Sequence, residues 1–135
     1  MKILKYSKAT NYALHTMLHL AYENSAKPLG VQKLAEQQKV SPTYLSKILT
    51  KLVKEGMVTS ASGANGGYSL AKGWESISFL DIIYAIEGKS SIFDCDFNHG
   101  PECPIQKVML RSEDKMEEEL RKQTIADLIA DKKTT

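Results

Sequence analysis

Apolar residues recur along the chain at the three- and four-residue spacing of amphipathic helices, and short polar or glycine-containing segments separate these stretches. Between residues 57 and 71 the pattern changes to two short β-like runs around a tip rich in glycine, alanine and asparagine. Helices are expected over residues 8–24, 31–38, 42–55, 79–87, 104–123 and 124–131. The chain is therefore predicted to be mostly α-helical, with one small β-hairpin.

Residues with helix-capping side chains stand where several of these helices should begin or end. Ser41 is a good N-cap, and Pro42 fits the first helical position because its missing N–H is not needed there. Gly56 is expected to end the same helix. The other predicted caps are Ser7, Ser78, Gly88 and a capping box of Thr124 with Asp127.

The helix expected over residues 42–55 has two contrasting faces. Its apolar residues follow the pattern of one buried face and are Leu45, Ile48, Leu49, Leu52 and Val53. The opposite face carries hydroxyl and lysine side chains, which are Thr43, Ser46, Lys47, Thr50, Lys51 and Lys54. Because no acidic residue precedes Glu55 on this helix, its outward surface is predicted to be basic.

A hairpin directly follows the basic helix. Asn65, Gly66 and Gly67 stand at its tip, where they can take the positive φ angles that a hairpin turn requires. Residues 89–103 are too polar and too broken for a regular element, so they are predicted to form a loop. Both cysteines of the chain, Cys95 and Cys103, lie in this predicted loop.

Length and composition restrict the class of protein. A chain of 135 residues with 42% apolar residues has the size and composition of one globular domain. It has no apolar run long enough to span a membrane, and its first residues lack the features of a secretory signal, so a cytoplasmic location is expected. An enzyme is not expected, because the sequence has no phosphate-binding loop, HExxH motif or nucleophile elbow.

The net charge of +2 conceals an uneven distribution. Residues 1–73 hold ten lysines, no arginine and three acidic residues, a net charge of +7. Residues 74–135 hold eight basic and thirteen acidic residues, a net charge of −5. A basic half joined to an acidic half suggests that the first half contacts a polyanion.

Two helices joined by a short turn, the second basic outside and followed by a hairpin, form the layout of a winged helix-turn-helix DNA-binding domain. Thr43, Ser46 and Lys47 could reach base edges in a major groove, while Lys51 and Lys54 would meet phosphates. The small residues of the hairpin tip could approach the DNA backbone or enter a minor groove. The predicted DNA-binding residues are Ser41, Thr43, Tyr44, Ser46, Lys47, Thr50, Lys51, Lys54, Ser62, Gly63, Asn65 and Gly66.

Four ordered motifs carry a family resemblance. They are YSKATNYALHTMLHLA (6–21), LAEQQKVSPTYLSKILTKLVKEGMV (34–58), SGANGGYSLA (62–71) and ISFLDIIYAIEG (77–88). Together they resemble the Rrf-two family of bacterial winged-helix transcriptional regulators, of the IscR, NsrR and CymR type. The resemblance extends over roughly Lys2 to Leu128, nearly the whole chain.

The resemblance implies a homodimeric transcription factor, usually a repressor, whose long C-terminal helices cross to form the dimer. The apolar stripe of the helix over 104–123 also needs a surface to bury it, and a second subunit is a natural candidate. That stripe is Ile105, Val108, Met109, Met116 and Leu120. A two-fold dimer predicts a palindromic operator in double-stranded DNA, with half-sites about one or two helical turns apart.

These expectations divide the chain into three parts. Residues 1–88 would form the winged helix-turn-helix DNA-binding domain, residues 89–104 a cysteine-containing sensor loop, and residues 105–135 a dimerisation helix and a short C-terminal helix. Ser46 stands where the family's iron-sulfur regulator has a glutamate, and Ser62 where it often has an arginine. With no arginine before Arg111, phosphate contacts and DNA shape are expected to carry much of the recognition, because lysine lacks the bidentate fork.

Members of this family commonly carry cysteines in the loop before the long helix, as iron-sulfur ligands or as thiol sensors. A thiol switch needs only Cys95 and Cys103. Cys103 precedes Pro104 at a helix N-terminus, whose dipole stabilises a thiolate, whereas Asp94 and Asp96 flank Cys95. Cys103 is therefore expected to react first and Cys95 to resolve the disulfide, in response to redox or nitrosative stress.

Two alternatives stay open. An iron-sulfur-dependent regulator of the same family is possible, but its cluster would need ligands besides the two cysteines, because cluster-binding members usually have three. The candidates are His15, His99, Asp94 and Glu102, and Asn11 stands where some relatives carry an acidic ligand. In the other alternative the protein regulates through a protein partner and its cysteines sense nothing. Because both alternatives are open, no cofactor is assigned.

Overall fold

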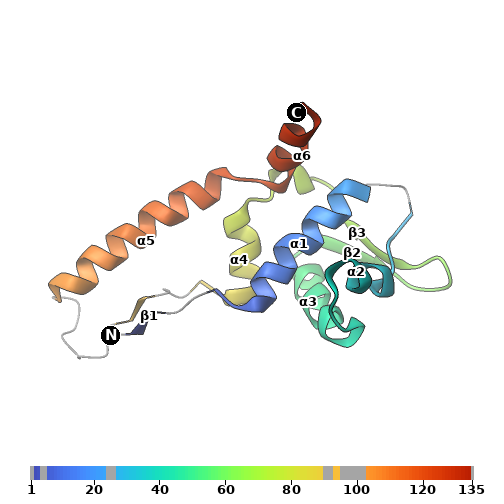
Figure 1. The fold of residues 1–135 in the computed structure, drawn as a ribbon, viewed down its shortest axis with the longest axis horizontal. Helices are drawn as coiled ribbons and strands as arrows, with labels where there is room; N and C mark the ends of the chain where they lie inside the picture. The colour runs from blue at the N-terminus through green and yellow to red at the C-terminus, as the bar shows by residue number, and fades with distance from the viewer. Residues whose placement is uncertain (1, 4–5, 24–26, 90–92, 95–102, 135) are drawn as a thin grey trace.

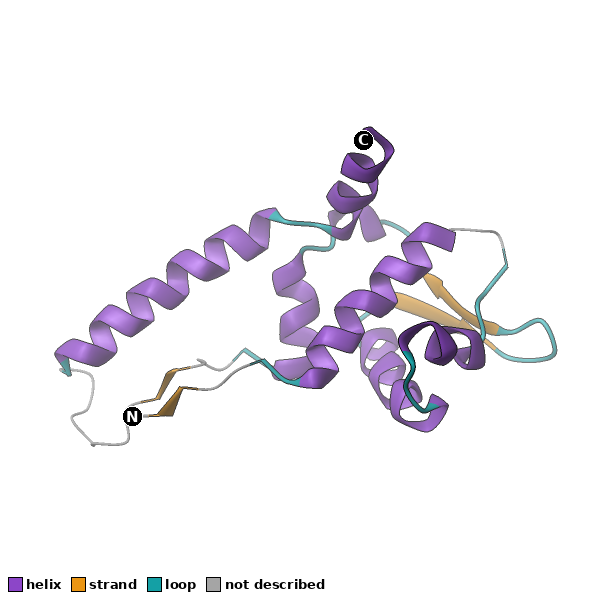
Figure 2. Ribbon diagram, viewed as in Figure 1, coloured by secondary structure: helices purple, strands orange, loops and turns teal. Residues whose placement is uncertain are grey.

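The computed structural model describes residues 2–3, 6–23, 27–89, 93–94 and 103–134 (Figures 1 and 2). Its helices are α1 (Lys8–Glu23), α2 (Val31–Gln38), α3 (Pro42–Lys54), α4 (Phe79–Glu87), α5 (Pro104–Lys122) and α6 (Ile125–Thr134), with a 3-10 helix η1 (Trp74–Ser76). Its strands are β1 (Lys2–Ile3), β2 (Val58–Ala61), β3 (Gly67–Leu70) and β4 (Phe93–Asp94). The prediction of a mostly helical fold with one hairpin is confirmed.

The caps explain why most predicted helix boundaries agree with the structure, although α6 continues three residues beyond its predicted end at residue 131. The Ser41 hydroxyl accepts a hydrogen bond from the Tyr44 N–H at 3.1 Å, directly before Pro42 in the first position of α3. Gly56 follows the last turn with φ +78°, so α3 ends at Lys54, one residue earlier than predicted. The Thr124 hydroxyl likewise caps α6 by accepting from the Asp127 N–H at 3.0 Å.

One predicted loop contains a strand. Residues 89–103 were expected to lack regular structure, but β4 pairs antiparallel with β1, with Ile3 opposite Phe93 and Lys2 opposite Asp94. The prediction was wrong at these residues because a two-residue strand is too short to show an alternating pattern, and its partner lies at the other end of the sequence. Residues 90–92 and 95–102 lie outside the described residues.

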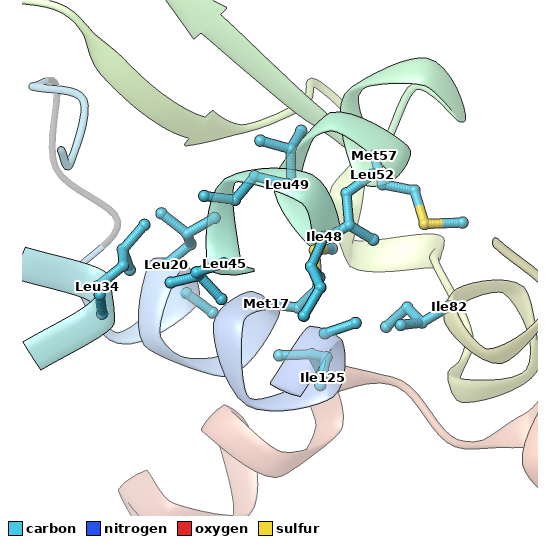
Figure 3. Close-up of a cluster of buried hydrophobic side chains, with 14 residues drawn as sticks. Met17, Leu20, Leu34, Leu45, Ile48, Leu49, Leu52, Met57, Ile82 and Ile125 are labelled. Atoms are coloured by element: carbon cyan, nitrogen blue, oxygen red, sulfur yellow. The ribbon is translucent and has the colours of Figure 1, made fainter. Parts of the chain in front are cut away.

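One hydrophobic core joins α1, α2, α3, α4 and α6 (Figure 3). Leu45, Leu49 and Leu52 of α3 have no exposed surface, and they pack with Met17 of α1 and Ile82 of α4. Burying one such side chain stabilises the fold by about 2 kcal/mol. The predicted apolar face of α3 is therefore the face that fixes this helix to the core, which leaves its opposite face at the surface.

The hairpin turn uses its glycines differently from the prediction. Strands β2 and β3 pair from Val58 opposite Leu70 to Ala61 opposite Gly67. Positive φ angles occur at Gly63 and Gly67, whereas Asn65 and Gly66 do not adopt them. Gly66 is instead required for space, because a Cβ there would lie 2.2 Å from the Ala61 carbonyl oxygen. The turn is therefore tight at its base.

A short segment before α2 extends the hairpin sheet. The Leu29 N–H donates to the Tyr68 carbonyl at 2.9 Å, and the Tyr68 N–H donates to the Leu29 carbonyl at 2.7 Å. A Cβ on Gly67 would lie 2.5 Å from the same Leu29 oxygen. These contacts hold the turn end of β3 against the segment before α2.

Helix α5 extends along the side of the molecule away from the hairpin (Figure 1). It contacts α4, where the Tyr84 hydroxyl donates to a Glu117 carboxylate oxygen at 2.8 Å. Burial, and then the bond to Glu117, raise the pKa of Tyr84, so the phenol keeps its proton for this bond. Ile105 and Val108 are 53% and 49% exposed, so the beginning of the apolar stripe of α5 is uncovered within the described chain, whereas Met109, Met116 and Leu120 are half-buried.

Glu87 joins the end of α4 to the beginning of α1. One of its carboxylate oxygens accepts from the Ser7 N–H at 2.5 Å and from the Thr10 hydroxyl at 2.6 Å. Burial raises the pKa of Glu87, but the hydrogen bonds from Thr10 and Ser7 and the charge of Lys51 outweigh it and hold the pKa below 4.5. The ionised carboxylate therefore stabilises the fold.

Glu87→Gln is expected to lower the free energy of unfolding near pH 7 by about 1–2 kcal/mol, because charge-assisted hydrogen bonds become neutral ones. The native contribution of Glu87 is complete above its unfolded-state pKa and is lost as pH falls through the lower folded-state pKa. Urea denaturation from pH 7 to pH 3 should therefore show the wild type and Glu87→Gln converging in acid. Exposed Glu75, replaced in the same way, serves as the control, and equal losses in both variants would contradict this role.

Candidate nucleic-acid interface

The outward face of α3 is exposed and positively charged. Lys47, Lys51 and Lys54 are exposed, and none of their ammonium groups lies within 4.0 Å of a carboxylate in the described part of the chain. Thr43 and Thr50 are exposed beside them, and Ser46 is partly buried. The face therefore combines lysines that form no close ion pair with short hydroxyl side chains, a combination suited to a phosphate backbone and to base edges.

Not every predicted hydroxyl on this face is available to a ligand. The Ser41 hydroxyl caps α3, and the Thr50 hydroxyl donates to the Ser46 carbonyl at 2.8 Å. Thr43, Ser46 and Lys47 line a shallow surface groove with Val31 and Pro42. The groove lies where the N-terminal ends of α2 and α3 meet, and Thr43, Ser46 and Lys47 are its polar lining.

An aromatic contact joins Tyr44 of α3 to helix α1. Its ring packs edge-to-face against Tyr12 of α1, with the ring centres 5.6 Å apart and an interplanar angle of 81°. Tyr44 remains 36% exposed. No local pattern in the sequence indicates this contact, because the two tyrosines belong to different helices.

The hairpin tip adds a second exposed surface. Ser62, Gly63 and Asn65 are exposed, whereas Gly66 is partly buried in the tight turn. The Gly66 N–H donates to the Gly63 carbonyl at 3.0 Å, which fixes the shape of the tip. Strand β2 contacts α3, so the hairpin is anchored beside the basic helix, and its tip projects from the fold (Figure 2).

The structure describes only one of the two cysteines. Cys103 is the N-cap residue of α5, as predicted, and its carbonyl accepts from the Lys107 N–H at 3.1 Å. Cys103 is 3% exposed, a burial that the sequence did not predict. Cys95, His99 and Glu102 lie outside the described residues, as does the side chain of Asp94.

The described residues do not form a metal site by themselves. His15 is exposed, and its Nδ1 lies 2.9 Å from the Asn11 carbonyl oxygen. Burial, followed by the charge of His15, holds the pKa of His19 below its usual 6.5. Over residues 6–23, 27–89 and 103–130, no three His, Cys, Asp or Glu side chains gather closely enough to hold a metal ion. The histidine pair and Cys103 therefore do not complete an iron-sulfur site on their own.

None of the helices that the structure describes is both long enough and apolar enough to cross a bilayer.

Comparison with known proteins agrees with this geometry. A family described as "Iron-dependent Transcriptional regulator" (Rrf2) matches residues 6–131. The Rrf2 protein of Nitratidesulfovibrio vulgaris is 33% identical over 134 residues, covering 95% of this chain and 89% of that protein.

Two solved structures extend the likeness to the fold. CymR of Bacillus subtilis, described as its global cysteine regulator, has 30% identity and a TM-score of 0.82 over 95% of this chain and 98% of that one. An oxidised form of CymR from Staphylococcus aureus has 31% identity and a TM-score of 0.76 over 93% and 95%. The match to the family covers nearly the whole chain, and its members are regulators rather than enzymes. The chain belongs to the Rrf2 family of DNA-binding, winged-helix transcriptional regulators.

Proposed function

We propose that the chain is a homodimeric transcriptional repressor that binds a palindromic operator and responds to redox or nitrosative stress through Cys95 and Cys103. The observation that carries the proposal is the exposed face of α3, where lysines and short hydroxyl side chains lie beside a glycine-rich hairpin. In this proposal residues 1–88 bind DNA, residues 89–104 sense the signal, and residues 105–135 pair the subunits.

The predicted DNA-binding side chains would contact different parts of the DNA. Thr43, Ser46 and Lys47 would face base edges in a major groove, because they line the groove at the N-terminal end of α3. Lys51 and Lys54 would contact phosphates farther along. The caps and supporting residues Ser41, Tyr44 and Thr50 would shape this surface, and Ser62, Gly63, Asn65 and Gly66 would bring the hairpin tip to the DNA backbone or a minor groove.

A second copy of the chain is the proposed cover for α5. Ile105 and Val108 expose about half of their surface, and apolar residues at helical spacing favour packing against another helix. Two-fold pairing through α5 would place two copies of α3 on one face of the dimer. An operator with two inverted half-sites, about one or two helical turns apart, would match that symmetry.

In the proposed switch, Cys103 and Cys95 form a disulfide. An oxidant such as a peroxide takes two electrons from the two thiols, both of which lose their protons, and the peroxide is reduced to water. Because Cys103 is buried at the N-cap of α5, its reaction requires the beginning of this helix to open. The oxidised form of S. aureus CymR supports a redox response in a relative.

An iron-sulfur cluster is the second candidate sensor, favoured by the iron dependence in the family's description. Cys95 and Cys103, with His15 or His99, would hold it, and the cluster would supply sensitivity to oxygen or nitric oxide. Because the described residues do not complete a metal site, no regulatory step is derived through it.

The test is a binding titration with duplexes selected from a random library, before and after treatment with hydrogen peroxide or a nitric oxide donor. We expect a palindrome bound about 1,000-fold more tightly than unrelated DNA, and an affinity change of about tenfold on oxidation. Cys103→Ser should abolish that change and leave the reduced affinity intact. A variant that still responds would reject the thiol switch, bound iron after anaerobic purification would favour the cluster, and failure to select any duplex would favour a protein partner.

A further inference from the structure

The turn between α2 and α3 contains the only residue other than glycine with a positive φ angle in the described chain. Lys39, the C-cap of α2, adopts φ +55° and ψ +47°, which is the left-handed helical region. A lysine is disfavoured there because its Cβ crowds the following carbonyl, whereas glycine is tolerated readily. The structure thus places a strained residue in the turn that positions the DNA-reading helix.

The hydrogen bonds of this turn do not require a lysine. The Lys39 N–H donates to the Glu36 carbonyl at 3.2 Å, and the Val40 N–H donates to the Ala35 carbonyl at 3.1 Å. Both are backbone bonds that glycine would make equally well. Among the described residues the Lys39 side chain makes no hydrogen bond or ion pair, so nothing within this part of the fold explains its charge.

The position of Lys39 allows its charge to contact a ligand outside the protein. It stands two residues before Ser41, the cap of α3, and its exposed side chain is therefore close in sequence to the end of α3 that carries Thr43 and Lys47. Two residues span at most about 7 Å, and a lysine side chain adds a comparable reach. In a helix-turn-helix the second helix lies in the major groove while the first crosses the DNA backbone, so the turn between the two helices is near a phosphate.

We propose that Lys39 is a phosphate-contact residue, and that its ammonium group, held out by a strained turn, anchors α3 on the DNA backbone. This inference rests on the proposed DNA-binding function and adds a residue outside α3 and the hairpin to its surface. Strained backbone positions cluster at functional sites, so the left-handed conformation of Lys39 favours a functional role for this residue. In this proposal Lys39 lowers the stability of the turn and raises the affinity for DNA.

Three variants separate the charge from the backbone. Lys39→Gly removes both the ammonium and the strain, Lys39→Gln removes only the ammonium, and Lys39→Arg keeps the charge. For a dimer on a full palindrome, losing one phosphate contact per subunit should weaken binding about 30-fold at 0.15 M salt and reduce the log–log salt slope by about 1.8. Lys39→Gly and Lys39→Gln should both show this loss equally on operator and random duplexes, and Lys39→Arg should bind within about twofold of the wild type.

Thermal unfolding supplies the second measurement. Lys39→Gly should raise the Tm by a few degrees because it relieves the left-handed strain, while Lys39→Gln should leave the Tm nearly unchanged. Lys115→Gln is the matched control, because Lys115 is an exposed lysine of α5 in the acidic half and pairs only weakly with Glu118 at 3.7 Å. It should change neither the Tm nor the salt slope.

The outcomes distinguish this inference from the proposed function. Unchanged affinity and slope in Lys39→Gly and Lys39→Gln, together with weakened binding when Lys51 and Lys54 are replaced, would overturn the role of Lys39 alone. Unchanged binding in all of these variants would overturn both proposals. A Lys39→Gly protein that is more stable and binds DNA more weakly would support the inference.

Discussion

Replacing Lys51 and Lys54 together with glutamine is expected to weaken operator binding about 1,000-fold at 0.15 M salt. Each subunit loses two phosphate contacts, so a dimer loses four, and each contact contributes about 0.9 to the log–log salt slope. The slope should therefore fall in magnitude by about 3.6. Fluorescence anisotropy from 50 to 300 mM salt measures both quantities, and random duplex DNA should be affected as strongly as the operator.

The matched control replaces Lys115 and Lys122 of α5 with glutamine. This double variant removes the same charge from the helix at the far side of the molecule, and Lys122, like Lys54, lies in the last turn of its helix. It should bind DNA within about threefold of the wild type, because screening weakens charges more than about 8 Å from the phosphates. An unchanged salt slope in the Lys51 and Lys54 variant would show that α3 does not face the DNA backbone.

Gly67→Ala is expected to lower the free energy of unfolding by about 2–3 kcal/mol. Gly67 has φ +143°, and a Cβ would stand 2.5 Å from the Leu29 carbonyl oxygen, so the hairpin must move away from the segment before α2. The amides of Leu29 and Tyr68 should then exchange faster with solvent, because each donates to the other residue's carbonyl. Urea denaturation and hydrogen exchange measure the two effects.

Gly30→Ala is the control for this prediction. Gly30 adjoins the same contact, but it has φ −74°, and a Cβ added there would have no other atom within 4 Å, so alanine should cost no more than about 0.5 kcal/mol. Because Gly67→Ala displaces the hairpin tip, it should also weaken DNA binding at concentrations of denaturant where the domain remains folded. Equal stability of the two variants would refute the close contact between the hairpin and the segment before α2.

Local signals determined most of the fold. The apolar period of α3, with Ser41 and Pro42 at its beginning and Gly56 after its end, predicted the helix to within one residue. The same period predicted which face would remain exposed, and this face became the candidate interface. Both results depend on neighbouring residues only, which is why they can be derived from one sequence.

Contacts between distant segments could not be predicted in this way. The pairing of β1 with β4 and the bonds from Ser7 and Thr10 to Glu87 join the ends of long stretches of chain, and no local pattern encodes them. The site shows the same limit, since the sequence indicated Tyr44 but not its edge-to-face contact with Tyr12 of α1. The sequence did not indicate a role for Lys39, because a left-handed lysine has no sequence pattern of its own.

Because residues 1–73 contain no arginine, every positively charged side chain in this half is a primary amine. Amines can be acylated under mild conditions, whereas a guanidinium group stays charged under the same treatment. Acylation of lysine removes its charge and its ability to bind phosphate. A single chemistry is thus sufficient to convert this half from +7 to −3, counting its side chains alone, and the amines that DNA shields from it would map the contact surface directly.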